Sequence, residues 1–153
     1  MPRVTTEWFA LDSFQNLVFS IARFYEYTGN YPEKITVVSH GFKEFRFKEL
    51  HRKAIAFPEG RFEFVGIDPP VMRTESAEKV RASEKETSGE WERDPYACTV
   101  EGALWEKRKS RGWSKRGNGY WDRCEEMRGL LTWCPSGGQK WFEGSLPWRI
   151  VKE

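Results

Sequence analysis

The residues best suited to hold a ligand follow predicted strands or open predicted helices. They carry hydroxyl, amide, carboxylate and cationic side chains: Ser13, Asn16, Ser39, Lys43, Arg46 and Asp68. Hydroxyl and amide groups hydrogen-bond polar ligands, while cations near a helix N-terminus favour an anion. The set predicts a site for a small anionic or nucleotide-like molecule. The alternatives are helix capping, solvated first-turn charges and, for the aspartate before Pro69-Pro70, turn formation.

Residues for catalysis are harder to find. Glu7 is the candidate general base if a reaction follows binding, because Gln15 cannot titrate. His40 directly follows a predicted strand, but no Ser–His–acid order stands out, so a loop role is favoured. His51 falls inside a predicted helix and is expected to be structural. Three dispersed cysteines and two histidines lack the close pairs of a zinc site. The sequence names no cofactor and leaves open whether the chain is an enzyme.

A basic segment at residues 107–116 points to another class of function. It places six cations and a tryptophan within ten residues, Lys107-Arg-Lys-Ser-Arg-Gly-Trp-Ser-Lys-Arg116. Cations beside an aromatic ring suit phosphate backbones and unstacked bases. Neighbouring glutamates nearly cancel the charge, and basic residues also complement the C-terminal end of their own helix. Nucleic-acid binding is therefore the less favoured alternative.

The elements that would position these residues alternate along the first seventy positions. Apolar residues at helical spacing predict a helix over 13–28, with Asp12 and Gln15 as a capping box and Gly29 at its end. The β-branched run 35–39 predicts a strand buried on both faces. Helical spacing returns over 42–57, and residues 62–67 predict the next strand. Val4-Thr5-Thr6 is interpreted as the end of a preceding strand.

This order predicts an α/β fold, a Rossmann-like parallel sheet in which the candidate residues meet at the carboxyl ends of the strands. Residues 1–71 supply about two or three strands, too few for such a sheet to be covered and paired. We therefore interpret them as the C-terminal part of a Rossmann-like domain. The missing strands would lie upstream in a longer parent or come from a partner, and Met1 could be an artefact of the gene model.

The rest of the chain changes character twice. Residues 72–94 are rich in Glu, Lys, Ser and Thr and are interpreted as a flexible charged linker, with a solvated helix as the alternative. Residues 95–153 form a helical, Trp-rich extension, with helices predicted over 96–108 and, behind an Asp122–Glu125 capping box, up to Cys134. We expect this extension to dock on the sheet domain, and its tryptophans could also offer a surface to a protein partner.

Two spaced motifs resemble those of the YdcF/SanA/ElyC family, a domain family of unknown function. In the first, an acidic residue ends a strand and a Ser/Thr–aromatic–Glu–Asn group opens the next helix. Glu7 takes the acidic position, and Ser13-Phe14-Gln15-Asn16 takes the second group. The second motif is a strand ending in Val-Thr-Ser, then an aromatic–His pair and an Arg, and Val37-Val38-Ser39, Phe42-Lys43 and Arg46 stand there. The Trp-rich tail resembles the fungal branch of the family.

The resemblance covers about residues 4–68 and implies a Rossmann-like ligand-binding domain. Departures limit what it implies about chemistry. Gln15 replaces the family glutamate, Ala10 replaces a second serine, and Lys43 replaces the histidine with one extra residue before it. The first family strands, with their Gly-rich loop, have no counterpart in this chain. A non-catalytic remnant or a protein-interaction module is therefore the alternative to a ligand-binding protein.

Composition excludes several other classes. The 153 residues carry a net charge of +2, which gives no overall field toward nucleic acid or membrane. Apolar residues make up 39% and aromatic residues 16%, so wholesale disorder is excluded. No apolar run approaches the roughly 20 residues that span a bilayer, and the N-terminus does not resemble a secretory signal. A cytoplasmic protein with Cys98, Cys124 and Cys134 as reduced thiols is the expectation.

Overall fold

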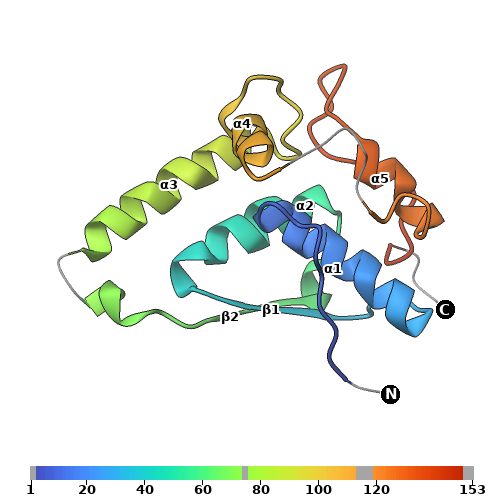
Figure 1. Ribbon diagram of the computed structural model, residues 1–153, viewed down its shortest axis with the longest axis horizontal. Coiled ribbons are helices and arrows are strands. Elements are labelled where there is room, and N and C mark those ends of the chain that lie inside the picture. The colour runs from blue at the N-terminus through green and yellow to red at the C-terminus, as the bar shows by residue number, and fades with distance from the viewer. Residues whose placement is uncertain (1–2, 74–75, 113–118, 150–153) are drawn as a thin grey trace.

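The computed structural model describes residues 3–73, 76–112 and 119–149, and the chain has the mixed α/β fold expected from the sequence. Helix α1 (Ser13–Thr28) and the helical segment that ends in α2 (Arg52–Ala54) lie on the same side of a small sheet (Figure 1). The sheet consists of the parallel strands β1 (Ile35–Ser39) and β2 (Phe62–Gly66). The remaining helices follow β2 in the chain: α3 (Ala77–Arg93), α4 (Ala103–Ser110) and α5 (Arg128–Thr132).

Helix α1 begins and ends where the capping residues predict. The Asp12 carboxylate accepts a hydrogen bond of 2.8 Å from the backbone N–H of Gln15, and Gly29 ends the helix in the left-handed region at φ 74°. The Gln15 side chain reaches back as in a capping box, but it accepts from the N–H of Leu11 rather than that of the cap residue. The N-terminal turn of α1 is therefore held at a fixed position relative to the segment before it.

The sheet is buried on one face only, which corrects the expectation that β1 is buried on both. Ile35 pairs with Phe62 and Val37 with Phe64, and these four side chains face the core. Alternate residues point away from it, so Val38 is 61% exposed. In the described residues no second layer covers this outer face. The expected strand at Val4–Thr6 is also absent, and the described sheet has two strands.

The connection from β1 to β2 is helical, as predicted, but it is not one regular α-helix. It runs through a 3-10 turn η1 (Gly41–Lys43), a π-helix η2 (Arg46–His51), α2 and a second 3-10 turn η3 (Glu59–Arg61). A π-helix closes i→i+5 hydrogen bonds, so Arg46 and His51 come onto one side of the turn. In a regular α-helix, at 3.6 residues per turn, two residues five apart point about 140° away from each other.

Residues interpreted as a flexible linker form a helix instead. Its start follows the 3-10 turn η4 (Pro70–Arg73), and α3 then runs for 17 residues from Ala77 to Arg93. The helix is anchored by Trp91, which is 1% exposed and packs against His51 at 4.7 Å and Phe14 at 6.0 Å between ring centroids. One large buried aromatic near its end gives this polar helix the tertiary contact that its composition alone does not indicate.

The Trp-rich extension contributes to the same core as α1. Trp148 donates from its indole N–H to the Ile55 carbonyl, and the Tyr96 hydroxyl donates to the Ala54 carbonyl. Tyr96 itself is not helical, because Asp94 accepts from two following backbone amides and closes a turn, so α4 begins later than predicted. The expected Asp122 cap is likewise absent, and the last helical stretch begins with the 3-10 turn η5 (Glu125–Met127).

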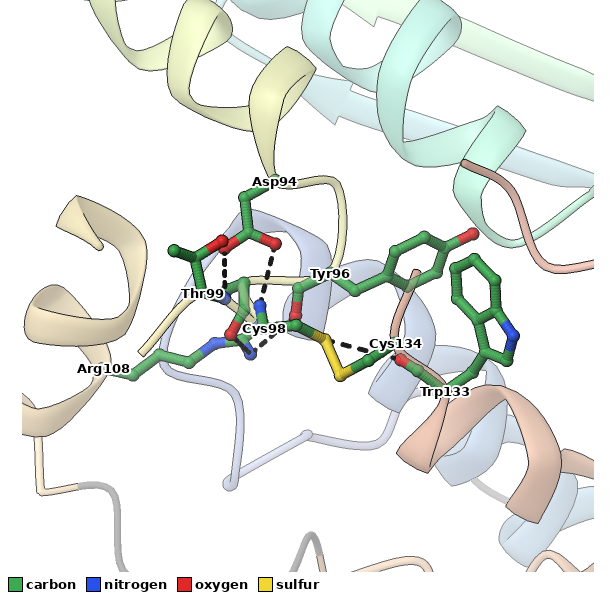
Figure 2. Close-up of a disulfide and its surroundings, with 8 residues drawn as sticks. Asp94, Tyr96, Cys98, Thr99, Arg108, Trp133 and Cys134 are labelled. Carbon is green, nitrogen blue, oxygen red and sulfur yellow. Dashed lines mark hydrogen bonds between the residues drawn. A yellow bond between two sulfur atoms is a disulfide. The ribbon is translucent and has the colours of Figure 1, made fainter. Parts of the chain in front are cut away.

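A disulfide joins two parts of this extension, which corrects the expectation of reduced thiols. Cys98 and Cys134 are bonded, 5.8 Å apart between Cα atoms, and Figure 2 shows the Cys98 sulfur directed at the Trp133 carbonyl beside the bond. Cys124 remains a free thiol, and burial raises its pKa to about 11. Sequence spacing could not reveal the pair, because 36 positions separate the partners.

Candidate functional site

The structure brings five of the six predicted ligand-binding residues to one cavity. It has a volume of about 760 Å³ and opens where α1 begins, β1 ends and the π-helix starts. The residues that line it from these elements include every expected member except the aspartate: Ser13, Asn16, Ser39, Lys43 and Arg46. The parallel sheet explains this meeting, since Ser39 is the last residue of β1 and the η1 and η2 turns follow it directly.

Glu7 and Asp68 do not line this cavity. Both carboxylate oxygens of Glu7 accept backbone hydrogen bonds, from Phe9 at 2.6 Å and Ala10 at 3.0 Å, and one also accepts from the Tyr120 hydroxyl. Glu7 thus stabilises the conformation of the segment before α1, and it does not face the cavity, where a general base would have to be. Asp68 follows β2 and lies against the backbone of Gly41. A Cβ atom added to Gly41 would stand 2.7 Å from Oδ1 of Asp68. Asp68 is exposed, in the segment between β2 and η4.

One wall of the cavity comes from α3, which the sequence interpretation assigned to a linker. Side chains at helical spacing line it, namely Lys79, Val80, Ser83, Glu84, Thr87 and Trp91. The signal was present as a weak i, i+3, i+7 pattern of Ala77, Val80 and Glu84 that ends in Trp91. Only three apolar residues, Ala77, Val80 and Trp91, share this spacing. Periodicity alone therefore did not distinguish a cavity wall from a solvated segment.

Arg46 is the most buried cation in the lining. Its side chain is 7% exposed and pairs with Glu84, 12% exposed, at 3.1 Å. Burial lowers the pKa of Arg46 and raises the pKa of Glu84, although each partner opposes the shift of the other. Among the described residues, Arg46 Nε has no hydrogen-bond partner. A buried guanidinium with a bare donor is costly, and an acceptor in the cavity would remove that cost.

Lys107 of α4 and Arg111, the C-cap residue of this helix, add further positive charge. Burial, followed by repulsion from Arg111 and Arg46, lowers the pKa of Lys107. The lining carries five cationic residues, which include Lys43 and Lys79, and two carboxylates, Asp12 and Glu84. Its charge is therefore positive, and mutual repulsion of the cations would be relieved by an anion.

Sequence reasoning missed a partner of Ser13. His51 Nε2 lies 2.8 Å from Ser13 Oγ, although 38 positions separate the two residues. His51 is fully buried, and burial together with the nearby cations Arg46 and Arg108 holds its pKa well below the usual range. It is structural in the sense expected, but it also contacts a cavity residue. No short motif signals this pair, because the π-helix is what turns His51 toward the start of α1.

His40, the histidine that directly follows β1, lies in a loop. Its ring stacks on Phe42 at 5.3 Å, and its Nδ1 is 3.2 Å from the Ile67 carbonyl oxygen. Within residues 3–73, 76–112 and 119–149 there is no group of three or more His, Cys, Asp or Glu that could hold a metal ion. In the same part of the chain, no helix has the length and apolar character needed to cross a membrane.

The basic segment is divided by the fold. Arg108 is buried and pairs with Asp12, Lys109 pairs with Glu106 at 2.9 Å, and Lys107 faces the cavity. Residues 113–118 of this segment lie outside the described residues. The cations described here therefore do not form one exposed strip for a phosphate backbone.

These features define a mixed α/β protein with a cationic cavity at the carboxyl end of a two-stranded parallel sheet. The chain is 48% identical over 66 residues to the uncharacterized protein YOR238W of Saccharomyces cerevisiae; the match covers 43% of this chain and 22% of that protein. The chain thus spans less than a quarter of this fungal relative. No protein-family model matches the chain. No solved structure matches it significantly.

Proposed function

We propose that this chain binds a small anionic, nucleotide-like molecule in the cavity between α1, β1 and α3, as a domain of the YdcF/SanA/ElyC type. The observation that carries the proposal is Arg46, a buried guanidinium that lines the cavity and has a bare Nε. A phosphate or carboxylate oxygen is the acceptor that would satisfy it. The yeast relative supports a fungal context and does not bear on the ligand.

The surroundings of Arg46 favour an anion over a neutral molecule. Lys43 and Lys107 face the same space, and Ser13 and Ser39 add hydroxyl groups that can donate to an oxyanion. Ser13 is the first residue of α1, where the backbone amides of a 16-residue helix carry partial positive charge. A volume of about 760 Å³ accommodates a molecule of nucleotide size.

The lining favours binding over catalysis. Asp12 and Glu84 supply its carboxylates, and each is paired with an arginine, Arg108 and Arg46 respectively. Both carboxylates are already engaged by these arginines, so neither is directed at a bound molecule as a general base would be. Glu7, the base proposed from the sequence, is bonded to backbone amides outside the cavity. We therefore propose a ligand-binding protein without assigning a reaction.

A second candidate, a protein-interaction module, is favoured by a different surface. The outer face of the sheet exposes Val38 and Ile67, each 61% accessible, and Val65 beside them. By contrast Trp91 and Trp148 are buried, so these two tryptophans cannot serve as a partner surface. Charged substitutions at Val38 and Ile67 should leave anion binding intact, and loss of any self-association in sedimentation experiments would assign that face.

The test of the first candidate is a titration of the folded chain with sulfate, phosphate and adenosine nucleotides by calorimetry and NMR. Lys107→Gln should weaken binding by roughly 1 kcal/mol, the scale of one partly screened charge at close range. Lys109→Gln is the matched control, because it removes the same charge two residues away from a lysine paired with Glu106. Equal effects of the two variants, or no binding of any anion, would count against the cavity.

A further inference from the structure

The contact between Ser13 and His51 has a direction that the rest of the site determines. Ser13 lines the cavity, whereas His51 lies behind it, fully buried, with Nε2 at 2.8 Å from the serine Oγ. A hydrogen bond at this distance can run either way, from the hydroxyl to a bare nitrogen or from a ring N–H to the hydroxyl oxygen. Which way it runs decides what Ser13 can do for a ligand.

The other ring nitrogen supplies the answer. His51 Nδ1 is buried and has no hydrogen-bond partner among the described residues. Aromatic rings surround the imidazole, with Trp91 at 4.7 Å, Phe47 at 5.4 Å and Phe14 at 5.8 Å between centroids. A neutral imidazole carries one N–H, and a buried N–H without an acceptor is rarer than a buried acceptor without a donor. The hydrogen therefore belongs on Nε2.

The imidazole is neutral rather than doubly protonated. Burial and the cations Arg46 and Arg108 hold the pKa of His51 well below its usual range. Protonation of Nδ1 would place a positive charge among aromatic rings, where the described residues offer Nδ1 no acceptor. One tautomer is thus selected across neutral pH.

We propose that His51 is a positioning residue that donates from Nε2 to Ser13 Oγ and thereby directs the serine hydroxyl proton into the cavity, toward a bound oxyanion. With one lone pair of the oxygen occupied by the histidine, the Ser13 O–H acts as a donor beside Arg46 and Lys43. This inference rests on the proposed anion binding and specifies what the hydroxyl contributes to it.

The same geometry argues against a nucleophilic serine. A Ser–His pair in acyl transfer needs a bare Nε2 that accepts the hydroxyl proton, with a carboxylate or carbonyl that receives Nδ1–H. Here Nδ1 has no hydrogen-bond partner in the part of the chain that the structure describes, and the deduced hydrogen bond runs in the opposite direction. Ser13 is therefore a ligand-binding hydroxyl, not an attacking group.

The first experiment measures the tautomer directly and does not depend on any ligand. Two-bond ¹H–¹⁵N correlation spectra of the ring nitrogens of His51 in the whole chain should show a protonated Nε2 and a bare Nδ1, unchanged between about pH 6 and 8. A protonated Nδ1 would overturn the inference. Covalent labelling of Ser13 by a fluorophosphonate would overturn it as well, because labelling requires a nucleophilic oxygen.

The second experiment measures sulfate affinity in four variants. Ser13→Ala should lose about tenfold, the worth of a hydrogen bond to a charged group, whereas Ser13→Thr should stay within a few-fold of the unaltered chain. His51→Gln keeps an N–H donor and should retain most of the affinity, while His51→Phe should weaken binding by several-fold. Equal affinity in Ser13→Ala and the unaltered chain would refute the donor role.

The outcomes separate this inference from the proposal on which it rests. If the unaltered chain binds neither sulfate nor phosphate, the proposed function fails while the tautomer measurement still decides how His51 and Ser13 are bonded. If the chain binds sulfate but His51 carries its hydrogen on Nδ1, anion binding stands and the positioning role falls. Thermal melts of the four variants identify any loss of affinity that is only loss of folded protein.

Discussion

Arg108 of α4 and Asp12 at the N-cap of α1 form a buried ion pair, with 2.5 Å between Nε and Oδ2. Their side chains are 10% and 4% exposed. Asp12 also caps α1 through Gln15, and Arg108 Nη1 donates to the Tyr96 carbonyl at 3.0 Å (Figure 2). This pair ties the start of α1, which forms one rim of the cavity, to the turn beside the disulfide.

Breaking the Asp12–Arg108 pair should destabilise the chain strongly. Arg108→Met leaves the buried carboxylate without its cation, so we expect a loss of about 3–5 kcal/mol in the free energy of unfolding. Adding Asp12→Asn, which keeps the cap but removes the charge, should recover part of that loss. Urea denaturation followed by tryptophan fluorescence measures both. A cost below about 1 kcal/mol for the single variant would contradict the burial of this pair.

Anion binding should depend on pH through Glu84. Burial raises the pKa of this carboxyl, so it becomes neutral at a higher pH than an exposed glutamate does. Below that pKa the cavity loses one negative charge, and sulfate affinity should rise as the pH falls through it, by roughly tenfold for one unit of linked shift. Sulfate is the suitable probe because its own charge is constant above about pH 3.

Glu84→Gln provides the matched test of that pH dependence. The variant should bind sulfate more tightly than the unaltered chain at neutral pH and should lose the increase on acidification. Glu86→Gln is the control, since Glu86 is exposed on α3 and does not line the cavity. Calorimetric titrations between about pH 4.5 and 8 separate the two, and identical pH profiles would assign the dependence to another group.

Reduction of the Cys98–Cys134 bond should lower the free energy of unfolding of the chain. A loop of 36 residues held closed in the unfolded state corresponds to about 3–4 kcal/mol in the chain-entropy account. Cys98→Ser should therefore reduce the urea midpoint, and dithiothreitol should have a comparable effect on the unaltered chain but none on the variant. If mass spectrometry of the alkylated, non-reduced chain shows both thiols free, the bond does not form.

Much of the fold was predictable because its signals are local. The helix over 13–28, its Asp12 cap and the strand at 35–39 follow from periodicity and capping within a few residues of each other. Convergence of Ser13, Ser39 and Arg46 at one edge also followed, since it needs only the parallel order of the strands.

What escaped prediction depends on contacts distant in sequence. The wall supplied by α3 rests on Trp91 packing against Phe14, and the disulfide joins Cys98 to a residue 36 positions away. Burial of Arg108 reversed the interpretation of a basic segment, because its partner lies 96 positions earlier. The exposed outer face of β1 has the same origin: β-branched composition signals a strand but not how many layers cover it.

The π-helix at Arg46–His51 has a consequence for comparing this chain with others. A helix with one widened turn holds one residue more than a regular helix across the same span. A homologous segment shorter by a single position could keep its guanidinium over the cavity or its imidazole behind the serine, but not both. Segment length between these two side chains, more than the identity of either, would then tell which homologues preserve the arrangement.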